Sequence, residues 1–143
     1  MATSTDTDRA LLASELRVVL AQLVRRLRAE KQPLPLTHTS VLSRLERDGP
    51  SSASELAAAE RMRPQSMAQM LAELDEQGLI VRTPDPNDGR RALVALTAAG
   101  GATLAECRRQ REGWLAGVLT QLSPAELGTL VDALPLLRRL AES

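Results

Sequence analysis

The sequence predicts a mainly helical fold that carries one small β-hairpin, and three observations lead to it. The chain has 143 residues with Trp114 as its only aromatic residue, so Leu, Val, Ala and Met must fill the core, a composition that favours helices. Apolar residues recur at helical spacing along most of the chain. Only two short runs, 79–83 and 92–97, are rich in residues typical of strands. We expect a single domain over residues 1–143.

Composition and charge exclude several classes of protein. The 18 basic and 18 acidic residues balance, so the chain as a whole creates no field that would attract a polyanion. A single cysteine, Cys107, excludes an intramolecular disulfide and fits a reducing compartment. No apolar run approaches the ~18 residues of a membrane span, and the N-terminus lacks the apolar segment of a signal peptide. We therefore expect a cytoplasmic protein without a membrane partner.

The first two helices are bounded by proline and glycine. Leucine and valine recur at helical spacing over 9–30, which predicts one long amphipathic helix that Pro33 and Pro35 end. A second helix carries Val41, Leu42 and Leu45 and should end near Asp48, before glycine and proline.

The next two helices begin at recognisable capping signals. Ser52 and Glu55 have the spacing of a capping box, which predicts a short third helix extending to about Arg61. Pro64 suits the first turn of a fourth helix, because its missing N–H would have no partner there. Gly78 is typical of the residue that follows a helix end.

A hairpin and two further helices complete the predicted order. Residues 84–89 should form a connection longer than a two-residue turn between the strand-like runs. Thr97 can cap a fifth helix reaching about Thr120. Ser123 and Glu126, with proline between them at the first turn, predict a sixth helix opened by a capping box.

Short helices followed by a hairpin describe a winged helix-turn-helix lobe, here over 34–97, flanked by long helices at 9–30 and 98–142 that we expect to mediate dimerisation. In such a lobe the last helix enters the major groove of double-stranded DNA and the hairpin, the wing, reaches a minor groove. Arg90 and Arg91 should contact DNA from the wing, since a narrow minor groove attracts arginine. Asp88 is close enough in sequence to pair with Arg90 and fix its direction.

Two segments resemble the MarR (multiple antibiotic resistance regulator) family of dimeric repressors. DPNDGRRALVALT is similar to that family's wing, and RMRPQSMAQMLAELDEQGLIVR is similar to its recognition helix and first wing strand. The resemblance implies a homodimer on a pseudo-palindromic operator, released by a small lipophilic or phenolic effector whose binding residues the sequence does not indicate. It also implies DNA contacts by Gln65, Ser66, Gln69, Asp88 and Arg90. Placement at the start of the recognition helix and on the wing adds Arg63 and Arg91 to the expected contacts.

This chain departs from the family pattern at two places. Many members carry arginine where this chain has Gln69, and glutamine favours adenine where arginine favours guanine. The second helix opens with Leu34 and Pro35 where leucine and threonine are usual.

Other classes of function find less support in the residues. No nucleophile–base pair, P-loop or dinucleotide fingerprint indicates an enzyme or a cofactor. A metal site needs three or four ligands, which His38, Cys107 and scattered carboxylates do not supply. His38 is expected to be a surface or capping residue and Cys107 to be buried and inert. An architectural DNA-binding protein without a ligand, and a helical module that binds protein, remain as alternatives.

Overall fold

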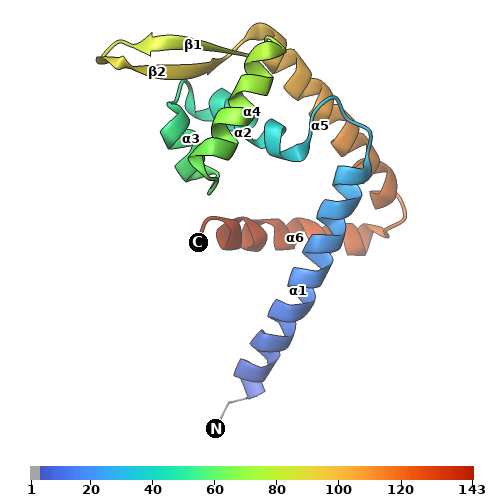
Figure 1. The fold of residues 1–143 in the computed structure, drawn as a ribbon. Helices are drawn as coiled ribbons and strands as arrows, with labels where there is room; N and C mark the ends of the chain where they lie inside the picture. The colour runs from blue at the N-terminus through green and yellow to red at the C-terminus, as the bar shows by residue number, and fades with distance from the viewer. Residues whose placement is uncertain (1–3) are drawn as a thin grey trace. The chain divides into compact units, whose positions relative to one another are not determined.

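A computed structural model of the chain describes residues 4–143, which divide into two compact units on either side of the step from Gln110 to Arg111. The described part is mainly helical with one hairpin, as predicted (Figure 1). Its elements are α1 (Ser4–Ala29), α2 (Leu36–Asp48), α3 (Ala53–Ala59), α4 (Pro64–Glu76), β1 (Ile80–Asp85), β2 (Asp88–Leu96), α5 (Ala98–Leu119) and α6 (Pro124–Ala141).

Most predicted helix ends are confirmed because local groups specify them. Pro64 is the first residue of α4, and Gly78 has a φ of 74°, the left-handed conformation that a residue after a helix end adopts. The Oγ1 atom of Thr97 accepts a hydrogen bond of 3.0 Å from the Gly100 N–H and so caps α5. The first helix begins at Ser4, earlier than the predicted Arg9.

The hairpin is longer and tighter than predicted. Pro84 pairs with Ala92 and Asp85 with Asp88, so only Pro86 and Asn87 remain as the turn between the strands. The prediction of a longer connection was wrong because proline is compatible with an edge strand. The strand pairing continues past Pro84 through a shift of register between Pro84 and Asp85.

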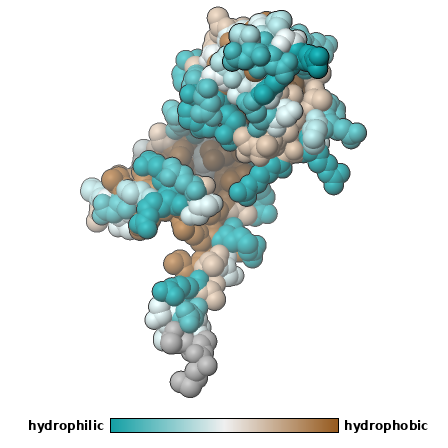
Figure 2. Space-filling model, turned by 90° about the vertical axis from the view of Figure 1, so that its left-hand side faces the viewer, coloured by the Kyte–Doolittle hydropathy of each residue, from teal (hydrophilic) through white to brown (hydrophobic). Residues whose placement is uncertain are grey.

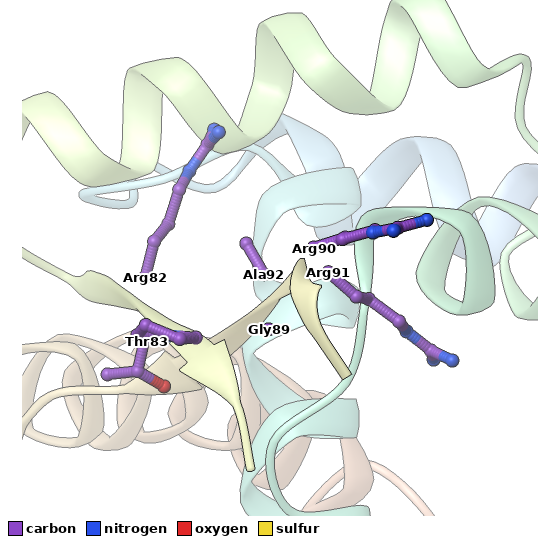
Figure 3. Close-up of a pocket in the computed structure, with 7 residues that line it drawn as sticks. Arg82, Thr83, Gly89, Arg90, Arg91 and Ala92 are labelled. Atoms are coloured by element: carbon purple, nitrogen blue, oxygen red, sulfur yellow. The ribbon is translucent and has the colours of Figure 1, made fainter. Parts of the chain in front are cut away.

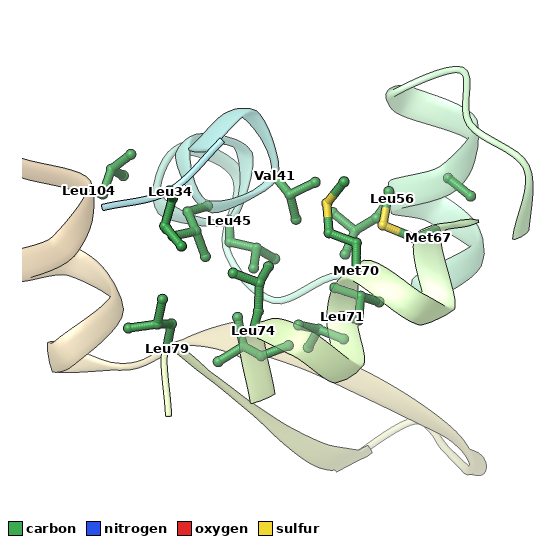
Figure 4. Packing of buried hydrophobic residues seen from close by; sticks show 14 of the residues in the cluster. Leu34, Val41, Leu45, Leu56, Met67, Met70, Leu71, Leu74, Leu79 and Leu104 are labelled. Atoms are coloured by element: carbon green, nitrogen blue, oxygen red, sulfur yellow. The ribbon is translucent and has the colours of Figure 1, made fainter. Parts of the chain in front are cut away.

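The core lies within Met1–Gln110, where α2, α3, α4, the hairpin and the start of α5 meet (Figure 4). Leu42, Leu56, Leu71 and Leu74 are fully buried there. Cys107 is also fully buried in this cluster, as predicted. Neither α1 nor α6 contributes a buried residue, so the core that is present belongs to the winged lobe and α5.

Candidate nucleic-acid interface

Helix α4 separates an apolar face from a polar one. Its buried residues are Met67, Met70, Leu71 and Leu74. Gln65, Ser66 and Gln69 are exposed. Gln69 follows Gln65 by four residues and Ser66 by three, so it neighbours both on the helix surface. The same packing that fixes α4 in the lobe therefore leaves these hydrogen-bonding side chains available to an external partner.

Arginine occupies two of the four positions between α3 and α4. Arg63 is the N-cap residue but makes no side-chain cap, since a guanidinium has no acceptor. Arg61 has a φ of 53°, the one non-glycine residue with positive φ among the described residues. The sequence analysis continued α3 to Arg61, whereas α3 ends at Ala59. A residue with positive φ after a helix end is usually glycine, and this chain has arginine there. The sequence therefore contained no signal that α3 ends before Arg61.

Polar contacts attach α2 to the helices around it. His38 Nε2 lies 2.8 Å from Glu73 Oε2, which ties α2 to α4. Arg44 Nε donates a hydrogen bond of 2.8 Å to Glu60 Oε1, and so ties α2 to the end of α3. His38 was expected to be a surface or capping residue, and Glu73, Arg44 and Glu60 were not identified from the sequence. Pairs that join residues far apart in the chain leave no periodic signal in the sequence.

Arg90 lies near the outer end of β2 with its side chain exposed (Figure 3). Asp88 Oδ1 accepts a hydrogen bond of 3.1 Å from the backbone N–H of Arg90. Asp88 was expected to pair with Arg90 and fix its direction, and the contact present is with the backbone of Arg90 and not with its guanidinium. Within residues 4–143 no hydrogen bond or ion pair holds the Arg90 guanidinium. An open depression of about 260 Å³ adjoins it, lined also by Arg82, Pro84 and Ala92.

Arg91 has partners within the chain, unlike Arg90. Its guanidinium forms an ion pair with Glu55, and its Nη2 atom donates a hydrogen bond of 2.9 Å to Ser52 Oγ. Its Nε atom also lies 3.9 Å from Asp85 Oδ2. The two adjacent arginines that the sequence analysis treated alike therefore have different surroundings.

Large apolar side chains are exposed on the helices outside the lobe. Figure 2 shows hydrophobic surface on α1, the helix that leads away from the grey N-terminal residues. Leu12 is 63% exposed on α1, and Val131 is 63% exposed on α6. The exposed large apolar residues of these two helices are Leu11, Leu12, Val18, Val19, Leu20, Leu23 and Val24, and Leu130, Val131, Leu134, Leu136, Leu137 and Leu140.

Residues 4–143 lack a cluster of metal ligands and a membrane-spanning helix. In that range no group of three or more His, Cys, Asp or Glu side chains is arranged to hold a metal ion. Nor does any helix of that range have the length and apolar character needed to cross a membrane.

Comparison with known proteins agrees with this arrangement. A sequence model of the MarR family matches residues 34–92. An HTH-type transcriptional regulator of Mycobacterium tuberculosis is 36% identical over 96% of this chain and 96% of its own length. The HTH-type transcriptional repressor NicR of Pseudomonas putida is 33% identical over 66% of this chain and 58% of its own.

A solved structure extends the similarity to three dimensions. A transcriptional regulator protein of Pseudomonas aeruginosa superimposes with a TM-score of 0.82 at 40% identity, covering 99% of both chains. These proteins are regulators and not enzymes. With a relative matched over nearly its whole length and a winged lobe in the structure, the chain belongs to the MarR family of DNA-binding transcriptional regulators.

Proposed function

We propose that the chain is a homodimeric repressor that binds a pseudo-palindromic operator. The observation that carries the proposal is the exposed guanidinium of Arg90 on the wing, beside a recognition helix whose outward residues are polar. The repressor role is supported by the similarity to NicR, which is named a repressor. A protein that occupies a promoter prevents transcription without any further chemistry.

The proposed contacts divide into those that position the protein and those that read sequence. Gln65, Ser66 and Gln69 would face base edges in the major groove, where glutamine can make a bidentate contact to adenine. Arg63, at the start of α4, would contact a phosphate, which fixes register without reading sequence. Arg90 would enter a minor groove, and Asp88 would hold its backbone in the required conformation.

Dimerisation is proposed from the apolar surface of α1 and α6. Rows of exposed leucine and valine of this extent are unfavourable in water, because every Å² of apolar surface removed from water contributes about 25 cal/mol. A second copy of the chain supplies complementary apolar helices by symmetry. Two lobes related by a two-fold axis would then bind half-sites about 10 base pairs apart, on one face of the duplex.

Release by a small lipophilic or phenolic effector completes the proposal. Two lobes that must meet the same face of the duplex tolerate little change in their spacing. The dimer would have one lobe spacing that fits the operator and another that does not. A ligand that binds the second form more tightly would lower the affinity for the operator, by an amount set by the ratio of its affinities for the two forms.

Binding of the purified protein to the DNA upstream of its own gene tests the proposal. Fluorescence anisotropy should show tight binding to one segment, weak binding to random DNA, and weaker operator binding when simple phenols are added. Inserting five base pairs between the half-sites should abolish tight binding.

The alternatives give different results in the same experiment. Equal affinity for all sequences would indicate an architectural DNA-binding protein. An absence of DNA binding at low salt would refute the proposal and favour a module that binds protein.

A further inference from the structure

The two S-x-x-E motifs that stand at the start of a helix form different contacts. At the start of α6, Ser123 Oγ accepts from the Glu126 N–H at 3.1 Å, and Glu126 Oε1 accepts from the Ser123 N–H at 3.0 Å. At the start of α3, Ser52 Oγ accepts from the Glu55 N–H at 3.2 Å, but the described contacts of the Glu55 carboxylate lead to Arg91. The Glu55 carboxylate thus pairs with Arg91 of the wing, where in a capping box it would accept a hydrogen bond from the backbone N–H of Ser52.

The contacts of Arg91 continue to the tip of the hairpin. Asp85 Oδ2 lies 3.9 Å from Arg91 Nε, and Asp85 Oδ1 accepts a hydrogen bond of 2.9 Å from the Asn87 N–H in the turn. The Asp85 side chain is 13% exposed, so water screens its charge less than that of Arg91 or Glu55. One guanidinium therefore joins the start of α3 to the residue that shapes the turn.

The strand that carries Arg91 is already anchored at its base. Ser51 and Val94 exchange backbone hydrogen bonds of 3.0 and 2.7 Å, which attach β2 to the segment before α3. Between Val94 and the tip of the hairpin, β2 pairs only with β1. The Arg91 contacts are what join its outer half to α3, and a two-stranded hairpin without support is marginal in water.

We propose that Arg91 is a positioning residue: together with Glu55, Ser52 and Asp85 it forms a wing clamp that holds the outer half of the hairpin against α3 and so aims Arg90 at DNA. The inference rests on the proposed function for its DNA readout. The wing clamp also gives Glu55 a role that favours DNA binding. Without the clamp, a carboxylate would only weaken binding, because its negative charge is repelled by the phosphates.

The sign of one substitution separates the wing clamp from simple contact with DNA. If Arg91 only supplied charge to DNA, Glu55→Gln would remove a repulsive group and strengthen binding. The wing clamp requires the opposite, a weaker affinity on the order of threefold to tenfold, as loss of one charge-assisted contact in a coupled network gives. Arg91→Lys keeps the charge but not the planar fork, so it should not restore affinity.

Anisotropy titrations at several salt concentrations, with operator DNA and the intact protein, provide the test. Arg91→Ala, Glu55→Gln and the double variant should weaken binding to a similar extent. The slope of log affinity against log salt should match the wild type in all three. Arg90→Ala is the matched control, and in a dimer it should shallow that slope by about two. Stronger binding by Glu55→Gln, or an Arg91→Ala slope like that of Arg90→Ala, would overturn the wing clamp and leave the proposed function standing.

A readout without DNA keeps the two proposals distinguishable. Backbone amide relaxation by NMR should show residues 87–90 becoming more mobile on the ns timescale in Glu55→Gln and Arg91→Ala, with the helices unchanged. Wing amides as ordered as in the wild type would overturn the wing clamp. Wild-type protein that binds no DNA at all would refute the proposed function and the clamp's purpose with it.

Discussion

Gly100 of α5 lies directly against the carbonyl group of Leu79, at the point where the chain leaves α4 and enters the hairpin. A β-carbon on Gly100 would overlap the Leu79 oxygen and would also meet the side chain of Leu96 at 2.7 Å. The same Leu79 oxygen accepts a hydrogen bond of 3.1 Å from the Thr97 N–H. The first turn of α5 is thereby fixed against the base of the wing, and the approach requires a residue without a side chain.

Gly100→Ala should destabilise the protein by about 1–3 kcal/mol or more, because the obstructing atom belongs to the backbone and cannot rotate away. Gly101→Ala is the matched control, since its β-carbon would meet only Leu96, at an ordinary 3.9 Å. The control should be neutral or slightly stabilising, because alanine favours a helix over glycine by about 1 kcal/mol. Urea unfolding measures both, and equal stability of the two variants would contradict this account.

The sequence predicted what short-range signals specify. Pro64, Gly78, Thr97 and the capping residues each act within one helical turn, so the helix ends could be predicted without knowledge of the fold. The strand ends were harder, because Pro84 and Asp85 are unfavourable in strands in general but fit this edge position.

Contacts between residues far apart in the chain could not be predicted. Arg90 and Arg91 are neighbours of one type, and what distinguishes them is the approach of Ser52 and Glu55, which are far away in sequence, together with Asp85. Likewise, nothing near His38 indicates that Glu73 is its partner.

Arg90→Ala should abolish tight operator binding while helicity and dimerisation stay intact. Its side chain is exposed and has no described partner, so its removal disturbs no internal contact. Circular dichroism tests the helicity, and gel-shift titration tests the affinity. An unchanged affinity would remove the wing from the mechanism.

Gln65→Ala and Gln69→Ala should relax sequence preference more than they weaken non-specific binding. A bidentate contact to a base contributes about 1–3 kcal/mol of discrimination, and a dimer makes it twice. Competition between operator and random DNA measures the ratio. Gln77→Ala, at the other end of α4, is the control and should leave that ratio unchanged. An equal loss of binding to both kinds of DNA would show that these glutamines do not read bases.

The capping box of α6 should make stability depend on acid. Hydrogen bonds from the backbone N–H and then the hydroxyl of Ser123 hold the pKa of Glu126 below its usual value of 4.5. A lowered pKa means that the ionised form stabilises the folded chain above the usual value, and that this contribution is lost as pH falls through the lower folded value.

Melting temperatures measured from neutral pH to pH 3 test this dependence in Glu126→Gln. The variant should be less stable than the wild type near neutral pH and should approach it in acid. Glu142→Gln, at the other end of α6, controls for the loss of one charge. A constant difference at every pH would separate the capping box from the acid response.

Dimerisation should be required for stability, because α1 and α6 have no buried residue within the described chain. Val131→Glu and Leu134→Glu place charges on apolar positions that are 63% and 52% exposed. A charge buried without a partner in an interface is strongly unfavourable, so both variants should dissociate the dimer and lower the melting temperature. Asp132→Asn, a polar position between them, should do neither. Sedimentation at low micromolar concentration should give only dimer for the wild type. A stable wild-type monomer that binds a single half-site tightly would refute the dimeric architecture, because two-fold symmetry is what sets the half-site spacing.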